Sequence, residues 1–169
     1  MRLFLVELKL EHITTKEAVQ ELIHQIHSDA TQVIEAQIAK GFRKAYLILE
    51  AEKQDFVEEA LYQHNLQIEL IKEVRLIGKD RAEVTSTSDS VNYLVEWDLP
   101  EHLTMDQYLE RKKKNSVHYQ EVPEVTFSRT YVCEDMTKCL CFYNAPNEDA
   151  VKKARAAVKA PITSLTKLE

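Results

Sequence analysis

The residues with the clearest chemical potential are the three cysteines of the segment YVCEDMTKCLCFYNAP, residues 131–146. Cys139 and Cys141 are two positions apart, so on a β-strand their side chains point to the same face. If residues 134–138 form the turn of a hairpin, Cys133 lies opposite Cys139 and the three thiols line one patch. Because thiolates bind soft metal ions and undergo redox reactions, this patch is a candidate metal or thiol redox site.

Cysteine also packs as a small hydrophobic residue, and this alternative stays open for the same segment. A shift of one residue in the strand pairing would place Cys133 on the other face of the sheet, away from Cys139 and Cys141. Three is an odd number of cysteines, and a chain of 169 residues can build a core without disulfides. We therefore expect three free thiols in a reducing cytoplasm.

Histidines add weaker candidates for a metal site. His102 precedes a predicted helix, and His118 follows the basic run ERKKKN. His24 and His27 have the i, i+3 spacing that can bring two imidazoles to one helix face, although the same spacing is typical of an exposed face. Imidazole suits nickel and zinc, whereas thiolates without imidazole favour zinc or copper(I). The residues alone assign no cofactor, and the three thiols without an imidazole would favour zinc or copper(I) over nickel.

The composition limits the classes of partner. The net charge of −6 argues against nucleic-acid binding and against attraction to anionic membranes. No apolar stretch reaches the length of a membrane-spanning helix, and the alternating segment MRLFLVELKLEH is unlike a signal peptide. The run ERKKKN lacks interleaved aromatic residues and is typical of a solvated helix face. We expect a cytoplasmic protein that binds a small ligand or a metal ion, and a homo-oligomer is compatible with this.

The elements that must position these side chains occur twice along the chain. FLVELKLEHIT near the start resembles YLVEWDLPEHLT after the midpoint, and YLILEAEKQDFVEEAL later resembles LCFYNAPNEDAVKKAR. Both pairs keep their order, which is the signature of an internal repeat. Thr14–Glu17 and Thr104–Gln107 both fit the capping box that begins a helix.

Each half reads as strand, helix, two strands, helix and strand. In the first half the predicted strands are 2–10, 32–38, 43–49 and 69–77, and the predicted second helix is 54–64. In the second half the predicted strands are 92–97, 125–133, 139–143 and 162–168, and the predicted second helix is 147–158. Gly41 supplies the turn of the first hairpin, because only glycine adopts positive φ at low cost. The order βαββαβ is that of the ferredoxin-like fold.

The predicted organisation is therefore α+β, with tandem ferredoxin-like repeats that form an internal pseudo-dimer. The first subdomain spans 1–78 and the second spans 92–169. The polar segment KDRAEVTSTSDS has no apolar periodicity, and we interpret 79–91 as a linker. A single ferredoxin-like unit leaves one face of its sheet uncovered, so we expect the two sheets to pack against each other.

The second half also resembles a known family on the segments VTFSRTYV, KCLCFYNAP and NEDAV, with Pro161. That family consists of small ferredoxin-like bacterial proteins of unknown function and includes a nickel-binding protein. The resemblance covers 93–169, matches the family cysteine at Cys141, and implies a nickel-related role. Two positions that are often histidine in the family are Ala154 and Arg129 here, and its usual Gly-Phe is Lys159-Ala160. We therefore expect weak or no nickel binding at that place.

Two classes of function remain open. The first is a non-enzymatic binding protein that holds a small ligand or metal ion at the inter-sheet surface. The second is a cofactor-independent enzyme of the dimeric α+β barrel type, an oxygenase or isomerase. A binding protein needs an apolar cleft or converging ligands, whereas an enzyme needs a histidine or carboxylate of perturbed pKa in its pocket. An interaction module without a pocket is also compatible with the sequence.

Overall fold

The computed structural model describes residues 1–86 and 90–169, and these form two compact units. Over the described residues, the first unit contains 1–75, 81–86 and 169, and the second contains 76–80 and 90–168. Among the described helices, none is long and apolar enough to cross a membrane.

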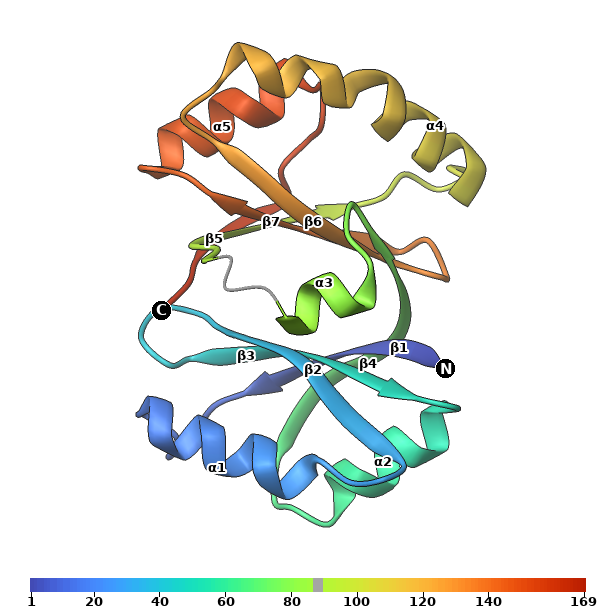
Figure 1. Ribbon diagram of the computed structural model, residues 1–169, viewed down its shortest axis with the longest axis vertical. Coiled ribbons are helices and arrows are strands. Elements are labelled where there is room, and N and C mark those ends of the chain that lie inside the picture. Colours follow the sequence, from blue (N-terminus) through green and yellow to red (C-terminus); the bar gives the residue numbers. More distant parts are fainter. Residues whose placement is uncertain (87–89) are drawn as a thin grey trace. The chain divides into compact units, whose positions relative to one another are not determined.

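The first unit is a four-stranded antiparallel sheet with two helices on one face (Figure 1). Its strands follow the spatial order β2-β3-β1-β4. Along the chain the elements are β1 (Arg2–Lys9), α1 (Lys16–Ile26), β2 (Thr31–Ile38), β3 (Lys44–Ala51), α2 (Gln54–Tyr62) and β4 (Gln67–Ile77). Gly41, between β2 and β3, has the predicted positive φ of 88°.

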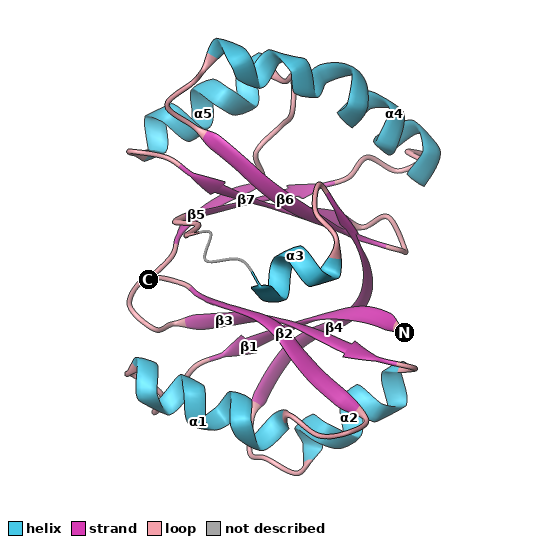
Figure 2. Cartoon of the chain, in the orientation of Figure 1, coloured by secondary structure: helices cyan, strands magenta, loops and turns pink. Residues whose placement is uncertain are grey.

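The second unit repeats this arrangement (Figure 2). Its strands follow the order β6-β7-β5-β8, which matches the first unit strand for strand. Along the chain the elements are β5 (Tyr93–Asp98), α4 (Met105–Asn115), the 3₁₀ helix η1 (Ser116–Glu121), β6 (Thr126–Cys133), β7 (Lys138–Asn144), α5 (Glu148–Ala157) and β8 (Ser164–Lys167). Both units have the order βαββαβ, so the predicted α+β class with two ferredoxin-like halves is confirmed.

The two predicted capping boxes have different outcomes. Thr104 begins α4 with the full motif, because its side chain accepts from the amide of Gln107 and the Gln107 side chain accepts from the Thr104 amide. In α1 the N-cap is Thr15 instead of Thr14, and Thr15 accepts from the amide of Ala18. The first prediction was wrong by one residue, and Ala18 has no side chain that could reach back.

Part of the predicted linker is helical. Residues Arg81–Ser86 form α3, a helix too short to show apolar periodicity in the sequence. Arg81 fixes it within the first unit by donating to the carboxylate of Glu50 (2.6 Å) and to the carbonyl of Met1 (2.7 Å). Residues 87–89 of the predicted linker lie outside the described part of the chain.

Strand pairing shows which residues of the two units are equivalent. Val6 pairs with Leu47 in the first unit, and Val95 pairs with Cys141 in the second. Leu47 and Cys141 are thus matched, as are their neighbours two positions away along β3 and β7. All of these side chains belong to the core between the sheet and the helices of their own unit.

Candidate functional site

Cys139 and Cys141 point towards the helices of the second unit. Cys141 pairs with Val95 on one side and Thr130 on the other, and Cys139 pairs with Trp97. Both sulfurs lie in the core cluster under α4 and α5, with each cysteine 1% exposed. The prediction that these two thiols share a face is confirmed.

Cys133 is on the other face of the sheet, and its predicted place opposite Cys139 was wrong. Cys139 pairs with Val132, because the turn contains the four residues 134–137 instead of five. The turn is tightened by Asp135, whose carboxylate accepts from the amide and the hydroxyl of Thr137. A one-residue change in register moves a side chain to the opposite face, so the three thiols do not form one patch.

A small cavity lies beside the two cysteines, with a volume of about 30 Å³. That space holds roughly two water molecules or a small ion. Three cationic side chains and no carboxylates are among the described residues that line it. The lining residues are Trp97, Tyr108, Arg111, Lys112, Asn115, Ser116, Tyr119, Cys139, Cys141, Arg155, Val158 and Ala160.

Arg155 is the central charge of the cavity. It projects from α5 and is only 2% exposed. Its Nη1 donates to the sulfur of Cys141 (3.4 Å) and to the hydroxyl of Tyr143 (3.1 Å), and its Nη2 donates to the carbonyl of Pro161 (2.5 Å). Its Nε has no hydrogen-bond partner among the described residues. A buried guanidinium with an unsatisfied donor is costly unless something binds it.

Tyrosine hydroxyls continue the polar network around Arg155. The hydroxyl oxygens of Tyr119 and Tyr143 are 2.7 Å apart. Burial raises the pKa of Tyr119 to about 12, and burial raises the pKa of Tyr143 well above its ordinary value. Both phenols are therefore neutral near pH 7 and can donate hydrogen bonds.

The sulfur of Cys141 is in surroundings that favour the thiolate. The thiol of Cys139 donates to it, and this is the largest influence that lowers the pKa of Cys141 well below its ordinary value. The charges of Lys112 and Arg155 act in the same direction, as does the hydroxyl of Thr130, which donates at 3.1 Å. Donation to Cys141, together with burial, raises the pKa of Cys139.

The polar side chains replace apolar ones at matched positions. Where the first unit has Ala45, Leu47 and Leu49 on β3, the second has Cys139, Cys141 and Tyr143 on β7. Where the first unit has Leu61 on α2, fully buried in its core, the second has Arg155 on α5. The fold itself does not require a charge there, since the same architecture is built with leucine.

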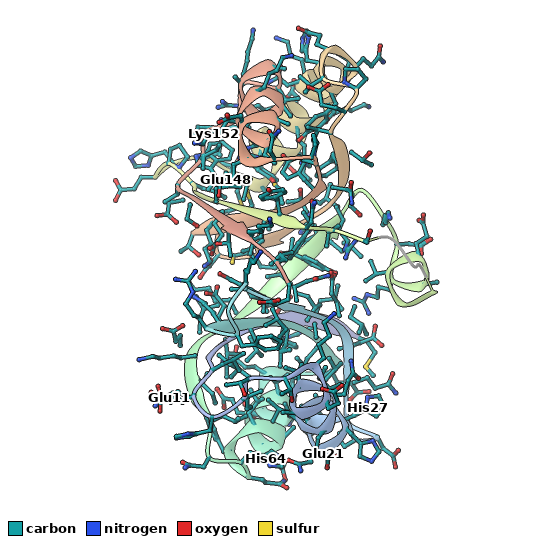
Figure 3. The ribbon with its side chains drawn as sticks, turned by 90° about the vertical axis from the view of Figure 1, so that its left-hand side faces the viewer. Glu11, Glu21, His27, His64, Glu148 and Lys152 are labelled. Atoms are coloured by element: carbon teal, nitrogen blue, oxygen red, sulfur yellow. The ribbon has the colours of Figure 1, made fainter. Side chains whose placement is uncertain are left out.

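The predicted histidine candidates lie elsewhere. His102 is exposed and has a positive φ of 65°, as its counterpart His12 does at 55°, so both occupy the turn before a helix. The Nδ1 atom of His118 is 2.5 Å from a carboxylate oxygen of Glu121. His27 also lies outside the cavity, on the helical side of the first unit (Figure 3). No group of three or more metal-binding side chains occurs among residues 1–86 and 90–169.

The sequence interpretation missed the cations of the cavity. Arg111 and Lys112 belong to the run that predicts a solvated face, yet both line the cavity, with Arg111 over the ring of Trp97 at 5.2 Å. Arg155 adjoins Ala154, the position that the family resemblance singled out. Comparison of the repeats was the available signal, because it aligns Arg155 with a core leucine.

Among the solved structures that resemble the whole chain are the following two. One is a protein provisionally named a chlorite dismutase, with a TM-score of 0.54 and 9% identity over 100% of this chain and 95% of the other. The second is a protein from Fusobacterium nucleatum subsp. nucleatum provisionally named a monooxygenase, with a TM-score of 0.54 and 11% identity over 99% and 90% of the two chains. At such low identity these likenesses show the fold alone.

No curated protein matches the sequence. A family model does match the second unit, over residues 93–168, and this is the segment that carries the cavity, Cys141 and Arg155. The resemblance drawn from the sequence motifs is confirmed: residues 93–168 match the family of SCO4226-like nickel responsive proteins.

Proposed function

We propose that the second unit binds a small anion in the cavity beside Arg155. The observation that carries this proposal is the buried guanidinium whose Nε lacks a partner among the described residues, at a position where the first unit has Leu61. A buried donor that lacks an acceptor is costly, and perturbed buried groups in a cavity are typical of binding sites.

The surrounding side chains support an anion over other ligands. Lys112 and Arg111 add positive charge to the lining, and Tyr119 offers a neutral hydroxyl. The volume of about 30 Å³ limits the ligand, or the part of it that enters, to a few heavy atoms. A carboxylate group or an inorganic anion of that size matches both the positive charge of the lining and the volume of the cavity.

The same residues do not fit a nickel ion. Cys139 and Cys141 carry the two thiols that could bind a soft cation. The guanidinium of Arg155 lies 3.4 Å from the sulfur of Cys141, and because it does not lose its proton it repels a metal cation there. No imidazole lines the described cavity, and imidazole is the usual protein ligand of nickel. The ligand of this proposal therefore differs from the metal in the family's name. The sequence predicts a ligand at the inter-sheet surface, whereas this cavity lies on the helix-covered face of the sheet.

Titration with sodium formate tests the proposal. Trp97 is the single tryptophan of the chain and lines the cavity, so its fluorescence reports occupancy. We expect a saturable change with formate and none with sulfate at matched ionic strength, because sulfate is larger than the cavity. Arg155→Met should abolish the formate response.

Arg2→Met is the matched control, since Arg2 is an exposed arginine of the first unit, 3.7 Å from Glu73, and its loss should leave the response intact. A formate response that does not saturate in the wild-type protein, or one that survives unchanged in Arg155→Met, would contradict the proposal.

A further inference from the structure

Anion binding does not use the sulfur of Cys141, which is also part of the cavity lining. We propose that Cys141 is a nucleophile that reduces small hydroperoxides. This activity goes beyond the proposed anion binding and does not depend on it, because a hydroperoxide is neutral and reacts with sulfur instead of pairing with Arg155.

Three donors surround the sulfur and fix its position. The hydroxyl of Thr130 donates to it at 3.1 Å from the neighbouring strand, and Nη1 of Arg155 donates at 3.4 Å from α5. The third donor is the thiol of Cys139, which itself accepts from the hydroxyl of Tyr108. Donors that point to one sulfur favour its thiolate, which is the form that nucleophilic attack requires.

The cavity selects the oxidant by size. Hydrogen peroxide has two heavy atoms, which fits a space of about 30 Å³. Common thiol reagents and bulky hydroperoxides are larger than this space. Because Cys141 is 1% exposed, a molecule can reach it only through the cavity or by local opening of the unit.

The chemical step balances without a cofactor. The Cys141 thiolate attacks one oxygen of the hydroperoxide, the O–O bond breaks, and a Cys141 sulfenic acid forms while an alkoxide or hydroxide leaves. Sulfur loses two electrons, and the two oxygens of the peroxide gain them. The leaving anion takes a proton from water. Arg155 lines the cavity, so its guanidinium can stabilise the negative charge that develops on the leaving oxygen.

The experiment is site-resolved oxidation of the reduced full-length protein. Hydrogen peroxide is added and quenched with catalase, the chain is unfolded in the presence of dimedone, and the labelled cysteine is identified by mass spectrometry. Trypsin separates the peptide 130–138, with Cys133, from the peptide 139–152, with Cys139 and Cys141. We expect dimedone on Cys141 at a rate at least about tenfold above that of the other two cysteines, since an ordinary thiol is only a few per cent ionised at pH 7.

Two further measurements make the result specific. The oxidation rate at Cys141 should change little between about pH 6 and 8, whereas an ordinary thiol gains about tenfold per pH unit in that range. Cumene hydroperoxide should react far more slowly than hydrogen peroxide. Cys141→Ser should remove the fast reaction, and Cys133→Ser, the same change on the other face of the sheet, should leave it intact.

Equal labelling of all three cysteines, or labelling of Cys141 no faster than in the unfolded chain, would overturn the proposal. These results come from the wild-type protein and do not require any variant to fold. They are also independent of the formate titration, so either proposal can fail while the other stands.

Discussion

The side chain of Cys141 couples the chemistry of the cavity to the stability of the fold. Its pKa in the folded chain lies well below the ordinary value of 9.0, mainly because Cys139 donates to the sulfur and the nearby cations favour the thiolate. The unfolded chain has none of these partners. Between the two pKa values the unfolded state therefore binds more protons than the folded state, so this contribution to stability rises with pH.

We expect the difference in free energy of unfolding between the wild-type protein and Cys141→Ser to increase as the pH rises towards 9. The slope cannot exceed about 1.4 kcal/mol per pH unit for one proton. As the pH falls through the lowered pKa of the folded state, the contribution of the thiolate is lost. Urea unfolding of both proteins from about pH 6 to 9 measures the difference. A constant or declining difference would show that Cys141 is a neutral thiol in the folded chain.

At the scale of elements, the end of α5 is a point of backbone strain. Lys159 follows this helix with a positive φ of 56°, in the left-handed region that favours glycine. Its amide and that of Ala160 still bond back to the helix carbonyls of Ala156 and Arg155. Glycine is the residue that most often occupies such a position after a helix, because it has no Cβ atom to clash with the backbone.

Lys159→Gly should raise the free energy of unfolding by about 1 kcal/mol, because glycine adopts this conformation without a clash between its side chain and the backbone. Lys159→Ala is the control: it also removes the charge and length of lysine but keeps the Cβ atom, and it should give no comparable gain. Denaturant unfolding of the two variants compares them directly. Equal gains in both would assign the effect to the lysine side chain instead of the backbone.

The matched helices α2 and α5 differ at a core position, which gives a second prediction at this scale. Leu61→Arg should destabilise the protein by roughly 3–5 kcal/mol, because the new guanidinium would be buried against Leu47 and Leu49 without acceptors. Leu61→Met, of similar volume and no charge, should cost less than about 1.5 kcal/mol. Thermal unfolding measures both. A small cost for Leu61→Arg would mean that the first unit adapts to a buried charge as the second does.

The elements were predictable to the extent that local patterns specify them. The repeat gave the βαββαβ order of both units, and the capping box at Thr104 placed the start of α4 correctly. The β6–β7 register was not predictable by counting residues, because an Asp135-centred turn uses four residues and Met136 has a positive φ of 60°. The cavity required tertiary information: Arg155 meets Cys141 only because α5 packs over β7.

For the whole molecule, the two units share one architecture and differ in what fills it. The first encloses an apolar core under its helices, whereas the second encloses a charged and sulfur-containing cluster in the same place. A ligand of this cluster should therefore stabilise the second unit selectively, since a ligand stabilises the state that binds it.

Sodium formate should slow amide hydrogen exchange in the second unit, in peptides from 93–168, and leave peptides from 1–75 unchanged. The contacts of Arg155 with Cys141, Tyr143 and Pro161 place the strongest protection in β7 and α5. Hydrogen exchange with mass spectrometry, with and without formate, measures both units in one sample. Equal slowing in both units would indicate a general salt effect.

The path of the chain through the units has a consequence for its synthesis. Glu169 belongs to the first unit, where its amide donates to the carbonyl of Ile38 (2.9 Å) and its carboxylate accepts from the amide of Gly41. Glu169 follows Gly41 by 128 residues, and every described residue of the second unit lies between them in the sequence. During synthesis, the strands of the first unit therefore emerge from the ribosome early. Glu169, which binds the β2–β3 turn of that unit, emerges only after the second unit. The unit that begins to form first on the ribosome is the one that is completed last.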